Sequence, residues 1–261
     1  MISAGALSNC SLVVITRNEQ DRIARCLESV PGVGEIIVVD SFSTDRTVEI
    51  ARLHGARVFQ REFKSAGDQK NWAMGKAEKD WILVLDADET LSSELVREIS
   101  EALGAPRGEG YRIRRRSEFL GARIRFCGWH NDWIIRLFRR GKGLYPEREV
   151  HEELRFEGPA PRLAGVIEHR PYRDLDDYVD RMKSYSRRGA AELDRRGSPW
   201  FPGIVTHPIA RFIRMYVLQL GFLDGGYGFV LCMLASVGVF LKYAFVRELS
   251  AGRVRGKAGA A

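Results

Sequence analysis

The sequence predicts an α/β protein with a mixed sheet flanked by helices and a C-terminal helical extension that associates with a membrane. Three observations support this prediction. Short apolar, β-branched segments alternate with helical ones over the first hundred residues, which is typical of a parallel sheet with helical crossovers. Polar residues gather where those segments end. A long apolar stretch near the C-terminus predicts the extension.

Composition sets the first limits on function. The chain has 261 residues, enough for one large domain and an appendage, and its 45% hydrophobic content excludes wholesale disorder. Its formal charge of +7 suits phosphate, anionic lipid or nucleic acid, or simply a solvated basic face. The four cysteines are widely spaced, which argues against a zinc knuckle or disulfide framework and fits a reducing cytosol. The first residues lack a basic segment, so no signal peptide is expected.

The first four strands are expected from apolar runs, which are "SLVVIT" (11–16), "EIIVVD" (35–40), "RVFQ" (57–60) and "WILVLD" (81–86). Helices are expected between and after them. Asn18 can cap the first, Ser43 or Thr44 the second, which Gly55 ends, and Asp68 lies near the cap of a third over 67–77. A fourth helix is expected over 92–103.

The pattern changes after residue 104. Short alternating segments predict additional, partly antiparallel strands over 111–119, 122–128, 133–140, 149–156 and 163–169. Asp174 can cap a helix with apolar residues at helical spacing, and the rest of the chain looks helical. We therefore expect a catalytic domain over 1–172, with halves of about 8–104 and 105–172, and a helical region over 173–261.

Polar side chains follow three of the expected strands at their carboxyl ends. In parallel sheets ligands bind beyond these ends, so the side chains are expected to line one crevice: Thr16, Asn18, Asp40, Ser43, Asp45, Asp86 and Asp88.

The segment "LDADET" (85–90) fits two chemistries, both of which use Mg²⁺ or Mn²⁺. Read as D-x-D-x-T, it matches haloacid dehalogenase-like phosphatases, with Asp86 as the nucleophile. Read as D-x-D, it matches the metal clamp of nucleotide-sugar glycosyltransferases. The phosphatase needs a later strand that ends in paired acids, but Asp176 and Asp177 lie in a helical segment. A third hypothesis is a basic membrane- or nucleic-acid-binding protein without catalysis.

Further motifs favour the glycosyltransferase. "VVITRNE" (13–19) and "VVDSFSTDRT" (38–47) resemble glycosyltransferase family 2, whose GT-A fold is a Rossmann-like mixed sheet. "GDQKNWA", "LDADE", "RLFRR", "VHEEL" and "GFLDG" occur in the order that resembles the lipopolysaccharide core β-1,4-glucosyltransferase group. This resemblance implies inverting transfer of a hexose, glucose, from a UDP-sugar to a lipid-linked saccharide such as a heptose of the inner core. No nucleic acid is expected as a partner.

The resemblance also implies roles for the donor-side residues. Asp40 would contact the nucleobase or ribose, and Asp88 would bind the metal directly while Asp86 meets the ribose or a metal-bound water. The remaining nucleotide-sugar residues would be Thr16, Asn18, Glu19, Ser43 and Asp45. Lys70 starts a helix and can meet phosphate there.

The general base must lie opposite the leaving diphosphate, in a different segment from the clamp. Asp132 and Glu152 are the candidates. The family places its base a few residues before a functional arginine, here Arg136, which favours Asp132. The family often has an acidic pair there, whereas this chain has Asn131 and Asp132. Arg136 can bind diphosphate, and His151 is a candidate third metal ligand.

The C-terminal third suggests attachment to a membrane without crossing it. The uncharged stretch 227–241 is shorter than the roughly twenty residues of a span, and Lys242 interrupts it. A preceding helix near 204–222 carries Arg211 and Arg214 among apolar residues, which suits the surface of an anionic membrane. We therefore expect a cytoplasmic protein, peripheral on the cytoplasmic face of the inner membrane.

Overall fold

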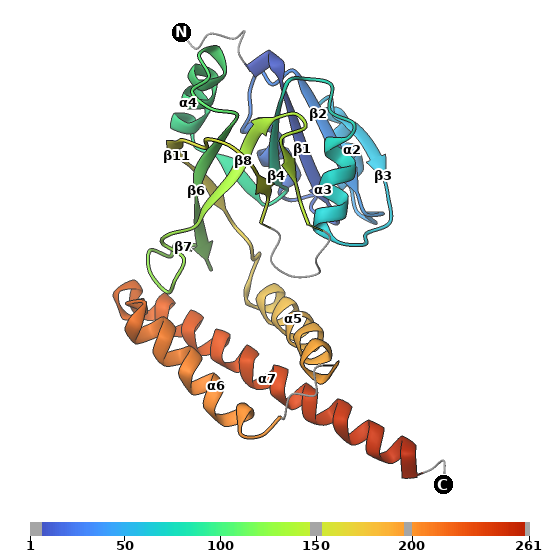
Figure 1. Ribbon diagram of the computed structural model, residues 1–261, viewed down its shortest axis with the longest axis vertical. Coiled ribbons are helices and arrows are strands. Elements are labelled where there is room, and N and C mark those ends of the chain that lie inside the picture. Colours follow the sequence, from blue (N-terminus) through green and yellow to red (C-terminus); the bar gives the residue numbers. More distant parts are fainter. Residues whose placement is uncertain (1–6, 147–152, 196–199, 259–261) are drawn as a thin grey trace. The chain divides into compact units, whose positions relative to one another are not determined.

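The computed structural model describes residues 7–146, 153–195 and 200–258, with side chains to residue 251. The chain forms two compact units (Figure 1). Unit 1 is Met1–Arg116 with Asp132–His169, and unit 2 is Ser117–Asn131 with Arg170–Ala261. This division differs from the expected one, because residues 117–131 belong with the C-terminal helices. The chain passes between the units three times, after Arg116, after Asn131 and after His169.

Unit 1 contains most of a mixed sheet in the order β3-β2-β1-β4-β8-β6-β11-β5. The first four strands in this order are parallel: β3 (Arg57–Gln60), β2 (Glu35–Asp40), β1 (Cys10–Thr16) and β4 (Trp81–Asp86). The next strands are β8 (Trp133–Arg139), β6 (Gly110–Phe119), β11 (Arg162–His169) and β5 (Glu89–Leu91). The β8 strand is antiparallel to β4, β6 is antiparallel to β8, and β11 is antiparallel to β5. The predicted mixed sheet is therefore confirmed.

Helices cover both faces of the parallel strands, because successive strand residues point into different cores. Leu12 and Val14 pack in one core with α1 (Ile23–Glu28) and α4 (Ser93–Gly104). Val13 packs in the other core with α3 (Ala66–Met74). The α2 helix (Thr47–Leu53) contributes Ala51 to the first core.

The helix starts differ from the expected caps. Asn18 lies before α1 in a left-handed conformation with φ 54°, and α1 begins only at Ile23. Arg46, not Ser43 or Thr44, precedes α2, whose first N–H is bonded by Asp45. Ser65 caps α3 by accepting the N–H of Asp68. Gly55 does end α2 with a positive φ, as expected.

The β5 strand has a decisive place in the sheet. It follows β4 within a few residues of the chain, yet β8, β6 and β11 lie between the two in the strand order. The sheet must therefore curve so that the ends of these three strands come near the D-x-D segment that joins β4 to β5. A separate two-stranded sheet pairs β9 (Gly143–Leu144) with β10 (Arg155–Phe156).

Unit 2 contains the α5 (Leu175–Arg195), α6 (Gly203–Phe212) and α7 (Gly225–Ala258) helices, and α7 packs against both others (Figure 1). A π-helix (Ile213–Leu218) and a short 3₁₀ helix (Gly221–Asp224) join α6 to α7. The 117–131 excursion, which includes β7 (Ala122–Arg123), packs on these helices through Phe119, Ile124 and Cys127. Asp224 fixes the excursion by accepting the backbone N–H groups of Arg125 and Phe126.

Candidate active site

Hydrogen bonds between side chains and backbone N–H groups join the two loops that follow β1 and β2. Asn18 accepts the N–H of Thr44 at 2.8 Å, and its own N–H donates to Ser43 Oγ at 2.8 Å. Asp45 accepts the N–H of Gln20, and Thr47 accepts that of Glu19. These bonds bring together four of the residues that the sequence assigned to the nucleotide-sugar, Asn18, Glu19, Ser43 and Asp45, and they hold both loops in place.

Asp40 is the buried anchor of this region. Its carboxylate is wholly inaccessible and accepts the backbone N–H and hydroxyl of Ser43 and the amide of Gln60. Between Asp40 and Ser43, Phe42 is exposed and held at a positive φ of 56°. Thr16 also ends β1 here, with its Oγ1 buried and without a hydrogen-bond partner.

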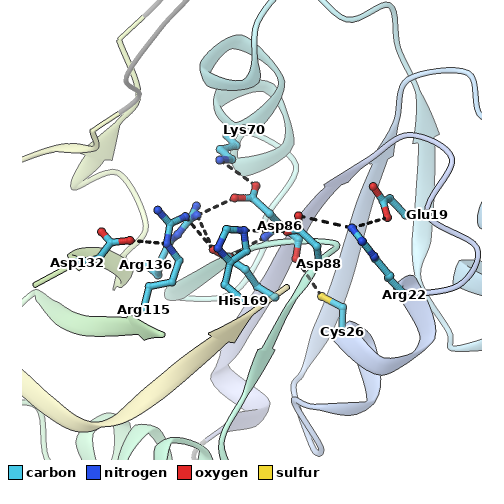
Figure 2. A network of polar contacts seen from close by, with 11 residues as sticks. Glu19, Arg22, Cys26, Lys70, Asp86, Asp88, Arg115, Asp132, Arg136 and His169 are labelled. Carbon is cyan, nitrogen blue, oxygen red and sulfur yellow. Dashed lines mark hydrogen bonds and ion pairs between the residues drawn. The ribbon is translucent and has the colours of Figure 1, made fainter. Parts of the chain in front are cut away.

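Asp86 is held by two cations. Lys70 Nζ on α3 lies 3.0 Å from Asp86 Oδ1, and Arg136 Nη2 on β8 lies 2.7 Å from Oδ2 (Figure 2). Burial alone would raise the pKa of Asp86, but the charges of Lys70 and Arg136 outweigh it and hold that pKa well below its usual range. Arg136 is itself buried, and its pKa is raised by Glu89 and Asp86 despite its burial.

Asp88 has a different environment. Its side chain is only 13% exposed, and Oδ1 is buried without a hydrogen-bond partner. The imidazole Nε2 of His169, the last residue of β11, lies 3.6 Å from that oxygen, and Arg22 lies 3.9 Å from the other (Figure 2). A buried, unsatisfied carboxylate oxygen beside an imidazole nitrogen fits a divalent cation. Within the residues described, no three acidic, histidine or cysteine side chains form a ready metal cage. Oxygen atoms of a bound nucleotide-sugar would therefore have to complete the coordination of the cation.

The expected acceptor-side residues divide into those the structure places and those it does not. Asp132 precedes β8, and Arg115 Nε donates to its Oδ2 at 2.7 Å. Arg136 lies on the same strand, within the buried cluster around Asp86. His151 and Glu152 lie outside the described residues.

Sequence reasoning missed three residues of this site. His169 ends an apolar strand, and the rule that selected Asp86 would have found it. Glu89 is the third acid of "DADE" and is completely buried. Arg115 had no signal beyond a basic segment. It joins the site because β6 lies beside β8.

Comparison with known proteins shows the family to which the chain belongs. The family model described as "Glycosyl transferase family 2" matches residues 11–150. An uncharacterized glycosyltransferase of Rickettsia felis is 30% identical, over 93% of this chain and 90% of its own. The lipopolysaccharide core biosynthesis glycosyltransferase LpsC of Rhizobium meliloti is 29% identical over 94% of each chain. The S. aureus TarS structure with UDP-GlcNAc covers 93% of this chain and 92% of its own, with 14% identity and a TM-score of 0.48. The chain therefore belongs to glycosyl transferase family 2.

Proposed function

We propose that this glycosyltransferase moves glucose from a UDP-sugar to a heptose of a lipid-linked lipopolysaccharide core, with inversion at the anomeric carbon. The observation that carries the proposal is the contrast between the two aspartates of the D-x-D segment. Asp86 is neutralised by Lys70 and Arg136, whereas Asp88 keeps a buried oxygen beside His169. The choice of acceptor rests on the likeness to the relative named for lipopolysaccharide core biosynthesis.

On the donor side, the two cations have the chemistry of a diphosphate site. Lys70 and Arg136 present ammonium and guanidinium groups at one carboxylate, and both of these side chains are largely buried. Such fixed positive groups stabilise the charge that develops on a departing diphosphate. Asp88 and His169 would hold Mg²⁺ or Mn²⁺, which supplies further electrostatic stabilisation of that charge when bound.

On the acceptor side, Asp132 would remove the proton of the attacking hydroxyl. Arg115 Nε donates a hydrogen bond to Oδ2 of Asp132, which would hold the carboxylate in place and leave Oδ1 to accept the proton of the hydroxyl. Glu152 remains the alternative base, because it too is a carboxylate in a different segment from the metal clamp. A phosphatase with Asp86 as the nucleophile is disfavoured, because both oxygens of Asp86 are engaged by cations.

Unit 2 would attach the enzyme to the cytoplasmic face of the inner membrane. In the described chain, one helical stretch, Gly221–Ala251, is long and apolar enough to cross a membrane, and only 22% of its most apolar window is buried. One face of α7 exposes apolar side chains, which are Val230, Met233, Val237 and Phe240. The opposite face is buried and carries Leu231, Cys232, Tyr243 and Val246. An exposed apolar face of this kind suits a helix that lies in the lipid interface.

A panel of nucleotide sugars tests the proposed reaction. The full chain is incubated with each donor, or with small phosphoesters, with Mn²⁺ or EDTA and with or without heptose-containing lipopolysaccharide core. The release of the donor's nucleoside diphosphate, or of phosphate, is measured. We expect metal-dependent turnover of UDP-glucose, stimulated by the core. Turnover of small phosphoesters without turnover of any nucleotide sugar would overturn the proposal.

A further inference from the structure

We propose that Glu89 is a positioning residue that sets the orientation of Arg136 on the donor side and Arg115 on the acceptor side. This inference rests on the proposed function, because it assigns those two sides. It concerns a carboxylate that touches neither donor nor acceptor and acts only through its two arginines.

The contacts of Glu89 account for both of its oxygens. Oε2 accepts the backbone N–H of Asp86 at 3.0 Å. Oε1 lies 3.1 Å from Arg136 Nη2 and 3.3 Å from Arg115 Nη1. The side chain has no exposed surface, so substrate cannot reach it in this structure.

These contacts join five charged residues in an alternating series. Asp86 pairs with Arg136, Arg136 with Glu89, Glu89 with Arg115, and Arg115 with Asp132. The series begins at the D-x-D segment and ends at the proposed base. Glu89 is the central member and the only one whose side chain is completely buried.

Local backbone geometry fixes Glu89 in this place. It is the first residue of β5 and lies opposite His169 in the β5–β11 pairing. Its bond to the N–H of Asp86 also closes the turn that carries Asp88. A buried carboxylate is unfavourable unless it is well paired, so Glu89 and the two guanidinium groups constrain one another. Without Glu89, Arg136 would keep only Asp86 as a carboxylate partner in the series, and Arg115 would keep only Asp132. Each guanidinium group could then change its orientation, because one ion pair alone would hold it.

A neighbouring ion pair provides a matched control. Arg116 on β6 and Glu168 on β11 pair at 3.0 Å in the same sheet, with 26% and 30% of their side chains exposed. Glu168→Gln removes a carboxylate from the same sheet without changing the alternating series. If Glu89 only stabilised the sheet, Glu89→Gln and Glu168→Gln would differ in the free energy of unfolding, but their rates per folded enzyme molecule would be the same.

The test compares Glu89→Gln, Glu89→Asp, Arg115→Gln and Glu168→Gln in the full chain. For each variant, thermal unfolding, the Kd for UDP with Mn²⁺, and kcat and KM for UDP-glucose with lipopolysaccharide core are measured. We expect Glu89→Gln to bind UDP yet to lose about 100-fold in kcat, the scale of an ångström-sized misplacement of reacting groups. Glu89→Asp keeps the charge but is one methylene shorter, so it should not restore kcat. Glu168→Gln should keep wild-type kcat.

The double variant Glu89→Gln/Arg115→Gln tests the route of the effect. If Glu89 acts through Arg115, the double variant loses much less than the product of the two single losses. A folded Glu89→Gln enzyme with kcat within about threefold of wild type, or an equal loss in Glu168→Gln, would overturn the inference. If Glu89→Gln does not fold, Arg115→Gln decides: unchanged kcat sinks the inference, and lowered kcat with unchanged UDP binding supports it. If the wild-type enzyme itself does not transfer glucose from any donor, the proposed function is wrong, and that result is distinct from a failure of the inference about Glu89.

Discussion

His169 Nε2 lies 3.6 Å from Asp88 Oδ1, although the two residues are far apart in the chain: Asp88 lies in the turn between β4 and β5, and His169 ends β11. The pairing of β11 with β5 brings them together, because β5 begins directly after the D-x-D segment. A histidine in this position changes the composition of the proposed metal site, because a nitrogen ligand favours Mn²⁺ over Mg²⁺.

Replacement of His169 by alanine should weaken Mn²⁺ binding. We expect the affinity for Mn²⁺, measured in the presence of UDP by electron paramagnetic resonance, to fall at least about tenfold. His54→Ala is the matched control, because His54 lies on a different surface and pairs with Glu28. Equal Mn²⁺ affinity in His169→Ala and wild type would remove His169 from the site.

The two aspartates of the D-x-D segment should differ in their contribution to stability. Asp86→Asn removes the anion that Lys70 and Arg136 share, so it should lower the free energy of unfolding by about 3–5 kcal/mol. Asp88→Asn removes an unsatisfied carboxylate oxygen and should cost less than about 1 kcal/mol. Both variants should lose transfer activity. Urea unfolding with equal losses in the two variants would contradict this difference.

Substitution of the proposed base should affect chemistry and spare donor binding. Asp132→Asn should lower kcat by about 100-fold or more while the Kd for UDP stays unchanged, because in the proposed mechanism Asp132 contacts the acceptor and not the donor. Glu152→Gln is the comparison. If it shows that kinetic pattern and Asp132→Asn does not, Glu152 is the base.

One surface pair should make stability depend weakly on pH. The pKa of His54 is raised, first by its hydrogen bond to Glu28 and then by its bond to the Ile50 carbonyl. A raised pKa in the folded state stabilises the fold below the unfolded value, near 6.5, and this stabilisation is lost as pH rises through the folded value. The effect should stay below about 1 kcal/mol, because Glu28 is largely exposed. His54→Gln should flatten the unfolding free energy between about pH 6 and 8. An unchanged slope would show that other groups cause it.

The exposed face of α7 should determine binding to lipid. Met233→Glu with Val237→Glu places two acids on that face without changing the buried face. Flotation with anionic vesicles at low salt should show at least about a tenfold loss of binding, the effect of losing even one buried apolar side chain. Leu53→Glu, at an exposed apolar residue of α2 in unit 1, is the control. If the Met233→Glu/Val237→Glu variant floats with the vesicles as well as the Leu53→Glu control does, the membrane contact lies elsewhere.

The sequence predicted those features that depend on local pattern. The four parallel strands appear within a residue or so of their expected bounds, and the GT-A architecture is confirmed. The polar residues after β1 and β2 do lie together, because parallel strands end at the same edge of a sheet.

Features that depend on long-range pairing could not be predicted in the same way. The place of β5 beside β11 follows from the curvature of the whole sheet, and no local pattern specifies it. The roles of Glu89 and Arg115 depend on that placement. The sequence marks an uncharged stretch only over 227–241, but α7 spans Gly225–Ala258, because alanine, lysine and arginine continue a helix beyond its apolar part.

The three passages of the chain between its units prevent either unit from being a transferable module. Deletion of the C-terminal helices would strip Phe119 and Ile124 of Met215 and Leu231, which pack in the same cluster. A soluble catalytic fragment would therefore need a second excision, replacing 117–131 with a short hairpin. Each of the three junctions also lies beside the polar network. Asp132 and His169 belong to that network, and Arg116 directly follows its member Arg115. Recombination could not exchange the C-terminal helices of this enzyme without redesign of the residues next to its candidate active site.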